Sequence, residues 1–248
     1  MIDTHSHILP GLDDGAANIS QSLAFMRMAA SEGVKTVFAT PHTCDGVFNC
    51  TKDQVLCALD GFNSGLEEQG IDTRLLPGAE IRVNHDLVTE YDKDNLLTLN
   101  NAGVYLLIEL PAMFMAPAIV MMIRQLRDRG VTPIIAHAER NPMIMTKPEL
   151  AADFVYNGGL IQITAGSLYG DFGKYSLKAA GKLLDMDQVF CLGSDIHPGR
   201  KYRMKDAGKK LIKLVGTTRA ELITRENPGR ILDENKVFYH GLHMKKAY

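Results

Sequence analysis

Seven short apolar runs, each separated from the next by a stretch with helical periodicity, constrain the fold of this chain more than any other feature. The runs cover residues 2–4, 34–40, 73–81, 104–110, 132–137, 160–165 and 189–195. Continuous apolar runs are typical of strands that are buried on both faces, as in parallel sheets. The pattern therefore predicts an α/β fold around a buried parallel sheet.

The segments between these runs show the spacing of helices. Apolar residues at positions 119, 122, 123 and 126 form one helical stripe, and positions 23, 26 and 30 form another that ends near Gly33. Further helices are expected over 149–156, 177–184 and 207–215, and from Thr217. Alternating strands and helices favour a barrel-like β/α fold, with an open doubly wound sheet as the alternative. We expect one domain, residues 1–248.

Composition and charge argue against several classes of protein. The 27 basic and 29 acidic residues nearly balance, which does not favour binding to nucleic acid or to a membrane surface. No basic start precedes an apolar run, and no stretch approaches the length of about 20 apolar residues that a membrane helix needs. We therefore expect neither a signal peptide nor membrane insertion.

The four cysteines, Cys44, Cys50, Cys57 and Cys191, form no C-x-x-C pair. This favours free thiols in a reducing cytoplasm over a structural zinc site. None of the four is followed by arginine six positions later, so the sequence lacks the phosphate-binding loop of the cysteine phosphatases.

Polar residues of metal-ligand type stand at or just beyond the carboxyl ends of the predicted strands. They are His5, His7, Asp14, His42, Glu80, Glu109, His137, Asp195 and His197. The carboxyl ends of barrel strands meet on one face, and buried carboxylates need a counter-charge. Nine candidates exceed what one ion binds, so we expect two or three divalent ions. The mixture of imidazole and carboxylate favours manganese, iron or zinc over calcium.

Each of these residues taken alone is ordinary, because single histidines and glutamates at strand ends are commonly hydrogen-bonded or paired with arginine. Their joint occurrence indicates a site, since five of the eight histidines fall on this rim. His85, His240 and His243 do not, and we assign them to the surface. In the first loop, Asp14 is the expected ligand, whereas Asp13 is expected to support the site or face solvent.

Apart from Asp14, the pattern of these ligand residues resembles that of the polymerase and histidinol phosphatase (PHP) superfamily of metal-dependent phosphoesterases. Longer stretches are more specific and resemble its bacterial capsule-type protein-tyrosine phosphatases: HSHILPGLDDGA, ATPH, LPGAEIRV, YLLIELP, PIIAHAERN and QITAGSLYGDFG. The resemblance implies a distorted (β/α)7, TIM-like barrel of the PHP type and a cluster of two or three metals, with manganese favoured. It also implies dephosphorylation of the tyrosine-rich tail of a bacterial kinase that controls capsule or exopolysaccharide synthesis.

The expected chemistry is attack on phosphorus by a metal-activated hydroxide. Arg140, three residues past a ligand histidine, is the first candidate for a phosphate clamp. Arg203 is the second; it lies one residue later than the family pattern suggests, and Arg200 competes with it for this role.

A strong general acid is not required, because a phenol with a pKa of about 10 leaves readily. Asp14 or His42 could donate the proton where metal does not engage them. Ser167 and Tyr169, in the loop after the sixth run, are expected to line the pocket.

Three other functions remain open at the level of sequence. A phosphomonoesterase such as histidinol-phosphate phosphatase would share every metal ligand. A nuclease or proofreading module is disfavoured by the balanced charge. A non-catalytic metal-binding protein would have no need of arginines beside an open cluster.

Overall fold

The computed structural model describes residues 1–233; residues 234–248, which include His240 and His243, lie outside the described part. Its strands are short, and every pair of neighbours within a sheet is parallel. The strands are β1 (Ile2–Ser6), β2 (Thr36–Ala39), β3 (His42–Thr43), β4 (Arg74–Pro77), β5 (Glu80–Arg82), β6 (Tyr105–Glu109), β7 (Thr132–Ile135), β8 (Leu160–Thr164) and β9 (Val189–Gly193).

Two of the predicted runs each correspond to a pair of short strands rather than to one strand. Strand β3 follows the second run after Pro41, and the third run is divided at Gly78 into β4 and β5. Proline has no N–H for a ladder, although the Pro41 carbonyl still accepts a hydrogen bond from Glu80 N at 3.0 Å. The seven predicted runs therefore mark seven positions around the sheet, two of which contain two short strands.

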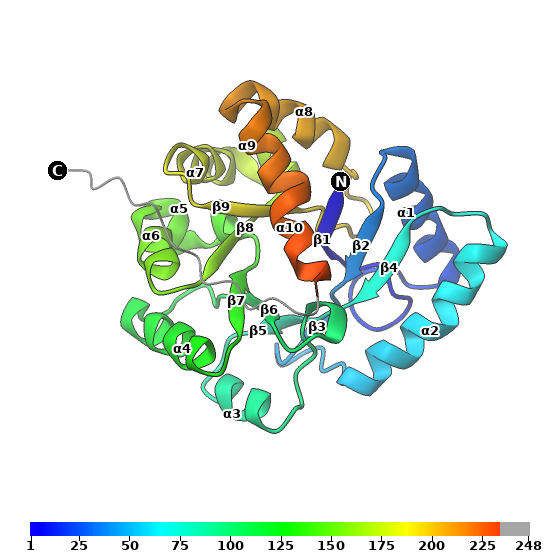
Figure 1. Cartoon of the computed structure of the whole chain (residues 1–248), viewed down its shortest axis with the longest axis horizontal. Coiled ribbons are helices and arrows are strands. Elements are labelled where there is room, and N and C mark those ends of the chain that lie inside the picture. The colour runs from blue at the N-terminus through cyan, green and yellow to red at the C-terminus, as the bar shows by residue number, and fades with distance from the viewer. Residues whose placement is uncertain (234–248) are drawn as a thin grey trace.

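The strands close into a distorted barrel. Their hydrogen-bonded order is β1-β2-β4 in one sheet and β3-β5-β6-β7-β8-β9 in the other, and the interrupted runs join the two sheets. Beyond β9, Asp195 N donates to His5 O at 2.8 Å and His7 N donates to Ile196 O at 3.3 Å, which links the last strand position to the first. Figure 1 shows the helices around these strands. The barrel prediction is confirmed over the open sheet.

The helices surround the barrel and include all those that were predicted. They are α1 (Ile19–Ser31), α2 (Lys52–Glu68), α3 (Leu87–Asp92), α4 (Ala116–Asp128), α5 (Pro142–Thr146), α6 (Glu149–Tyr156), α7 (Gly173–Asp185), α8 (Met204–Val215), α9 (Thr217–Glu221) and α10 (Asn227–Gly229). Four of them, α2, α3, α5 and α10, were not predicted. The buried residues of α2, at positions 55, 59, 62 and 66, keep helical spacing, so its signal was present in the sequence.

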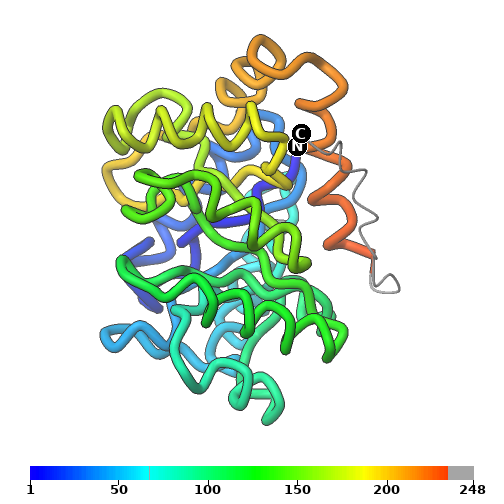
Figure 2. The backbone as a smooth tube through the Cα atoms, turned by 90° about the vertical axis from the view of Figure 1, so that its left-hand side faces the viewer, coloured from blue at the N-terminus to red at the C-terminus, as the bar shows by residue number. Residues whose placement is uncertain are grey.

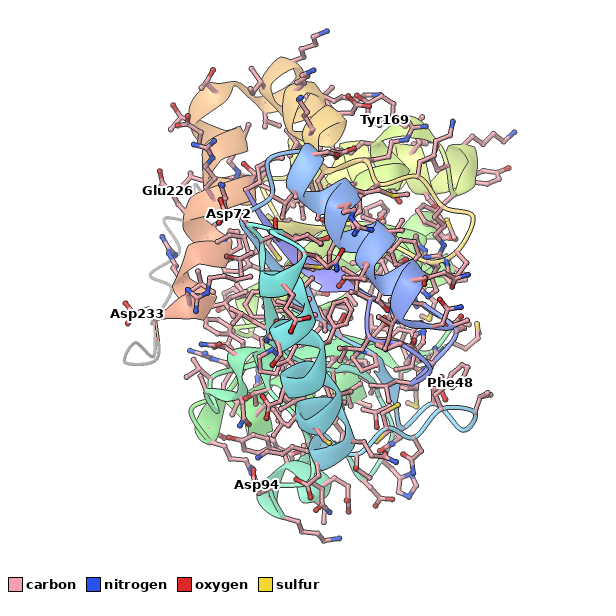
Figure 3. The ribbon with its side chains drawn as sticks, turned by 90° about the vertical axis from the view of Figure 1, so that its right-hand side faces the viewer. Phe48, Asp72, Asp94, Tyr169, Glu226 and Asp233 are labelled. Atoms are coloured by element: carbon pink, nitrogen blue, oxygen red, sulfur yellow. The ribbon has the colours of Figure 1, made fainter. Side chains whose placement is uncertain are left out.

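The segment from α9 onward covers the amino-terminal end of the barrel. α10 contacts β1 and β9, and Asn227 Nδ2 donates to Phe190 O at 2.9 Å. Figure 2 shows this segment beside the start of β1. In Figure 3, Glu226 and Asp233 lie at the opposite edge of the molecule from Phe48, which belongs to the loop after β3. The carboxyl ends of the strands are therefore at the end that this segment leaves uncovered.

All four cysteines are free thiols, as predicted. Burial raises the pKa of the Cys191 thiol to about 12, so this side chain is a neutral thiol at neutral pH. Among residues 1–233, no helix has both the length and the apolar composition that crossing a bilayer requires.

Candidate metal centre

All nine predicted ligand residues converge at the carboxyl end of the barrel. They come from β1 and the loop after it (His5, His7, Asp14), from β3 and β5 (His42, Glu80), from the end of β6 (Glu109) and from the loops after β7 and β9 (His137, Asp195, His197). The register of the sheet places His42 opposite Glu80. His85, by contrast, is exposed on the surface, as predicted.

His5, in β1, and His7, directly after it, present the same ring nitrogen to one point. His5 Nδ1 lies 2.8 Å from Gln162 Oε1, and His7 Nδ1 lies 2.6 Å from Asp13 Oδ2. Both partners are oxygens that accept, so each Nδ1 carries its proton and donates. When the rings are neutral, each therefore has its lone pair on Nε2, and the two Nε2 atoms are 3.1 Å apart.

Two lone pairs that face each other at this distance repel unless a cation lies between them. Ligand atoms about 2.1 Å from one ion and at right angles to each other are about 3 Å apart. Glu80 Oε2 lies 3.2 Å from His5 Nε2 and 3.3 Å from His7 Nε2. These three side chains form one group of ligand atoms that could hold an ion.

A second group is centred on the loop after β1. Asp14 Oδ1 lies 3.2 Å from His197 Nε2 and 3.6 Å from His42 Nε2, and His7 completes the group. Nδ1 of His197 donates to the Asp195 carbonyl at 3.0 Å, which leaves Nε2 free to bind. The Asp14 side chain is 53% exposed, so this group is the more open to solvent.

The Glu80 carboxylate lies between the groups. Its Oε1 is 2.6 Å from His137 Nε2, and its Oε2 is 3.1 Å from His42 Nδ1. A third group of possible ligands consists of His42, Glu80 and Glu109. The Glu80 carboxylate thus belongs to two of the three candidate groups.

Unsatisfied buried atoms test whether the residues fit a metal cluster. Within the described residues, six buried side-chain atoms form no hydrogen bond, and His42 Nδ1, Glu80 Oε2 and Glu109 Oε2 are three of them. Glu109 Oε2 is instead ion-paired with Arg82 Nε at 3.0 Å. Such atoms are costly unless something satisfies them. All three belong to one candidate ligand group, and the donor set suits divalent transition metals. The residues therefore fit the metal centre that the sequence predicts.

The electrostatics of the cluster point the same way. Burial lowers the pKa of His7, but its hydrogen bonds with Asp13 and Glu80 raise it to about 10. Burial and the neighbouring Glu80 charge raise the pKa of Glu109 to about 7. In both cases the metal-free cluster favours the protonated side chain, and for His7 this adds a positive charge. A bound cation would supply that positive charge instead.

Two of the candidate ligands adopt a backbone conformation that is uncommon for residues other than glycine. His137 has φ 31° and Asp195 has φ 51°. Arg140 N donates to His137 O at 2.8 Å, and Asp195 N donates to His5 O at 2.8 Å, so hydrogen bonds hold both residues in place. Strain of this kind is concentrated at functional sites.

Two arginines border the cluster. Arg140 Nη1 donates to Asp195 Oδ2, and Arg200 Nη1 donates to the same oxygen at 2.6 Å and to the Asp195 carbonyl at 2.8 Å. Both guanidinium groups lie over the Phe172 ring, with Cζ 4.3 Å and 5.3 Å from its centroid. A cavity of about 150 Å³ opens next to Arg140, and Arg82, Glu109 and His137 also line it.

The remaining predicted residues of the pocket have other contacts. Arg203 donates to Asp171 at 2.9 and 3.1 Å, and it has no recorded contact with the nine candidate ligands among the described residues. Ser167 is buried and donates to Glu139 Oε1 at 2.5 Å, so it does not line an open pocket. Tyr169 is 39% exposed and lies under the Arg203 guanidinium.

Several supporting residues were missed at the level of sequence. Gln162 contacts His5, as described above. Asp3, fully buried, accepts from Ser194 N at 2.8 Å and from Tyr202 Oη at 2.7 Å, which ties β1 to the segment that carries Asp195. Burial raises the pKa of Asp3. The available signal was a polar residue inside an otherwise apolar run.

Asp13 supports the cluster, as predicted for this residue. Besides His7 Nδ1, it accepts from His42 N at 3.0 Å and from Gly15 N at 2.9 Å. Gly15 is required here, because a Cβ at this position would lie 2.2 Å from the His7 carbonyl oxygen. The loop sequence DDGA thus supplies one supporting carboxylate and one that faces the cluster.

Comparison with known proteins identifies the family. The family model "Capsular polysaccharide synthesis, CpsB/CapC" matches residues 1–233. The chain belongs to the CpsB/CapC family. The tyrosine-protein phosphatase YwqE of Bacillus subtilis (strain 168) is 35% identical over 240 residues, which cover 96% of this chain and 94% of YwqE. CpsB of Streptococcus pneumoniae, also a tyrosine-protein phosphatase, is 27% identical over 239 residues and covers 94% of this chain and 98% of CpsB.

Solved structures agree with this assignment. A crystal structure from the pair YwqE and CpsB, described as metal-dependent tyrosine phosphatases, matches with a TM-score of 0.90 and 34% identity over 96% of each chain. The histidinol phosphate phosphatase of Lactococcus lactis matches with a TM-score of 0.58 and 9% identity, over 90% of this chain and 94% of that one. The latter shows a shared fold only. The predicted resemblance to the bacterial capsule-type tyrosine phosphatases is confirmed.

Proposed function

We propose that this CpsB/CapC protein hydrolyses phosphotyrosine in proteins, with the cluster of nine ligand residues as its metal centre. The single observation that supports this most is the placement of Arg140 and Arg200 directly beside a cluster with unsatisfied buried ligand atoms. Relatives named tyrosine-protein phosphatases match nearly the whole chain. The substrate we propose is the tyrosine-rich tail of a bacterial kinase for capsule or exopolysaccharide synthesis, met in the cytoplasm.

The proposed ligands are the nine residues described above, and the proposed metals are two or three divalent ions, with manganese favoured. When bound, such ions lower the pKa of a coordinated water and offset charge on the phosphoryl oxygens. His5 and His7 present Nε2 to the cluster because Gln162 and Asp13 hold their Nδ1 protons. The Glu80 carboxylate links His5, His42 and His137.

The arginines are proposed to bind the phosphoryl group. Arg140 and Arg200 share Asp195 Oδ2, and phosphoryl oxygens can compete for the same donors because both are anionic acceptors. The cavity of about 150 Å³ between Arg82 and Arg140, with Glu109 and His137 in its lining, is the proposed entry site. Where metal does not engage it, the half-exposed Asp14 is the proposed proton donor, with His42 as the alternative.

A substrate panel tests the proposed function. Protein loaded with Mn²⁺ is expected to hydrolyse a phosphotyrosine peptide much faster than histidinol phosphate, and a chelator is expected to abolish both reactions. His5→Ala should remove the activity, because His5 presents one of the two facing Nε2 atoms. Faster turnover of histidinol phosphate would favour the other phosphatase function, and tight metal binding without turnover of either substrate would favour a non-catalytic protein.

Alanine substitutions of Arg200 and of Arg203 are expected to lower catalytic efficiency to different extents. Arg200→Ala should lower kcat/KM for the phosphotyrosine peptide by about 10- to 100-fold, the range for a lost hydrogen bond to a charged group. Arg203→Ala should change it by less than about threefold, since Arg203 is paired with Asp171. Steady-state kinetics of both variants measure this, and a larger loss for Arg203→Ala would reverse the assignment.

A further inference from the structure

Strand β8 contributes none of the nine ligands, yet it places a polar side chain beside one of them. Gln162 is fully buried, and its side chain lies between His5 and Thr4. Gln162 Oε1 is 2.8 Å from His5 Nδ1, and Gln162 Nε2 is 2.7 Å from Thr4 Oγ1. A buried amide with both ends engaged is held in one orientation.

The direction of these hydrogen bonds is fixed by a backbone carbonyl. Thr4 Oγ1 donates its proton to Leu192 O at 3.0 Å, because a carbonyl can only accept. The Thr4 oxygen is then the acceptor for Gln162 Nε2, which turns Gln162 Oε1 toward His5. His5 must therefore carry its proton on Nδ1. Its Nε2 lone pair consequently faces the cluster.

The packing beside this chain of hydrogen bonds leaves no room for a side chain at position 193. Gly193 lies against both side chains: a Cβ at this position would be 2.6 Å from His5 Cβ and 3.1 Å from Gln162 Oε1. His7 reaches the same proton arrangement through a carboxylate, Asp13. His5 and His7 thus differ in the group that accepts the Nδ1 proton: a neutral amide for His5 and a carboxylate for His7.

We propose that Gln162 is a positioning residue that fixes the tautomer of His5 for metal binding. It acts through a chain of hydrogen bonds that runs from Leu192 O through Thr4 and Gln162 to His5. Partners of this kind for metal-bound histidines typically contribute about 10- to 100-fold to metal affinity. Without an acceptor at Nδ1, the His5 proton moves to Nε2, where Glu80 Oε2 at 3.2 Å accepts it. A proton on Nε2 excludes the metal from that nitrogen.

Two substitutions at one position separate this role from simple packing. Gln162→Met keeps the length of the side chain and removes the acceptor. Gln162→Glu keeps an acceptor oxygen and adds a buried charge. We expect Gln162→Met to weaken Mn²⁺ binding about 10- to 100-fold and Gln162→Glu to weaken it less than about fivefold. Electron paramagnetic resonance of free Mn²⁺ during titration of the full-length protein measures the affinity.

The opposite ranking, with Met tolerated and Glu deleterious, would overturn the proposal and assign Gln162 to packing. Gln188→Met is the matched control: Gln188 is half-buried at the start of β9, bonded to Met186 O, and its replacement should leave Mn²⁺ affinity unchanged. Thermal unfolding of each metal-free variant verifies folding.

Nuclear magnetic resonance of the metal-free protein gives a readout that packing alone would not move. The ¹⁵N shifts of His5, recorded at a pH where its ring is neutral and assigned by their loss in His5→Ala, should report Nδ1–H in the wild type and Gln162→Glu, and Nε2–H in Gln162→Met. An unchanged tautomer in Gln162→Met would overturn the proposal. The inference rests on the proposed function only for the presence of a metal, so its failure leaves the phosphatase assays unaffected.

Discussion

Glu80→Gln is expected to lower hydrolysis of a phosphotyrosine peptide by about a thousandfold or more, and to reduce the bound Mn²⁺. The carboxylate of Glu80 lies within 3.3 Å of ring nitrogens of His5, His7, His42 and His137. Glutamine keeps the size of the side chain but removes the charge that bridges the groups. A loss of about 4 kcal/mol of metal-derived stabilisation corresponds to this factor.

Elemental analysis of the purified variant and steady-state kinetics in excess Mn²⁺ measure the two effects separately. Glu90→Gln is a matched control. Glu90, on α3, contacts Lys93 and Asn95 and none of the nine ligand residues. A Glu80→Gln protein with full metal content and unchanged kcat would show that Glu80 is not a ligand. Normal metal content with low kcat would place its role in the reaction rather than in metal retention.

Arg140→Ala is expected to lower kcat by about 100- to 1,000-fold, the range observed when one donor to a developing negative charge is removed. Arg140 is held toward the cluster by Asp195 Oδ2 and by the face of Phe172. Its guanidinium can bind two phosphoryl oxygens at once. Arg140→Lys should recover only part of the activity, because an ammonium group does not reproduce this planar fork.

Single-turnover kinetics and inhibition by inorganic phosphate measure the effect on chemistry and on oxyanion binding. Arg129→Ala serves as the control, because Arg129 is paired with Asp92 away from the cluster. Normal turnover by Arg140→Ala would remove Arg140 from the phosphate clamp and leave Arg200 as the candidate. The metal content of Arg140→Ala should equal that of the wild type, which distinguishes this variant from Glu80→Gln.

The convergence of the nine candidate ligands could be predicted from the sequence because parallel strands impose a simple geometric rule. Residues such as His42, Glu109 and His137 follow buried strands, and the carboxyl ends of those strands meet on one face of a barrel. Their convergence therefore requires only that the strands be identified. The breaks after β2 and β4 did not disturb this, because β3 and β5 continue in parallel register.

The loops and supporting residues were harder to predict. Arg203 is adjacent in sequence to the site but is paired with Asp171, whereas Arg200 reaches Asp195. Ser167 is buried against Glu139 instead of lining the pocket. Long side chains and loop residues take partners that are distant in the chain, and no local pattern specifies which one is nearest.

The sequence by itself determined the barrel, the end of it that holds the site and the residue types gathered there, because strand period and strand direction are local properties. Only the tertiary structure decided which nitrogen of His5 faces the cluster and which arginine borders it. Those outcomes depend on contacts such as Gln162 with His5, across 157 positions of the chain. Such contacts exist only after the barrel has closed, since β8 pairs with β9 within the sheet and closure brings β9 beside β1.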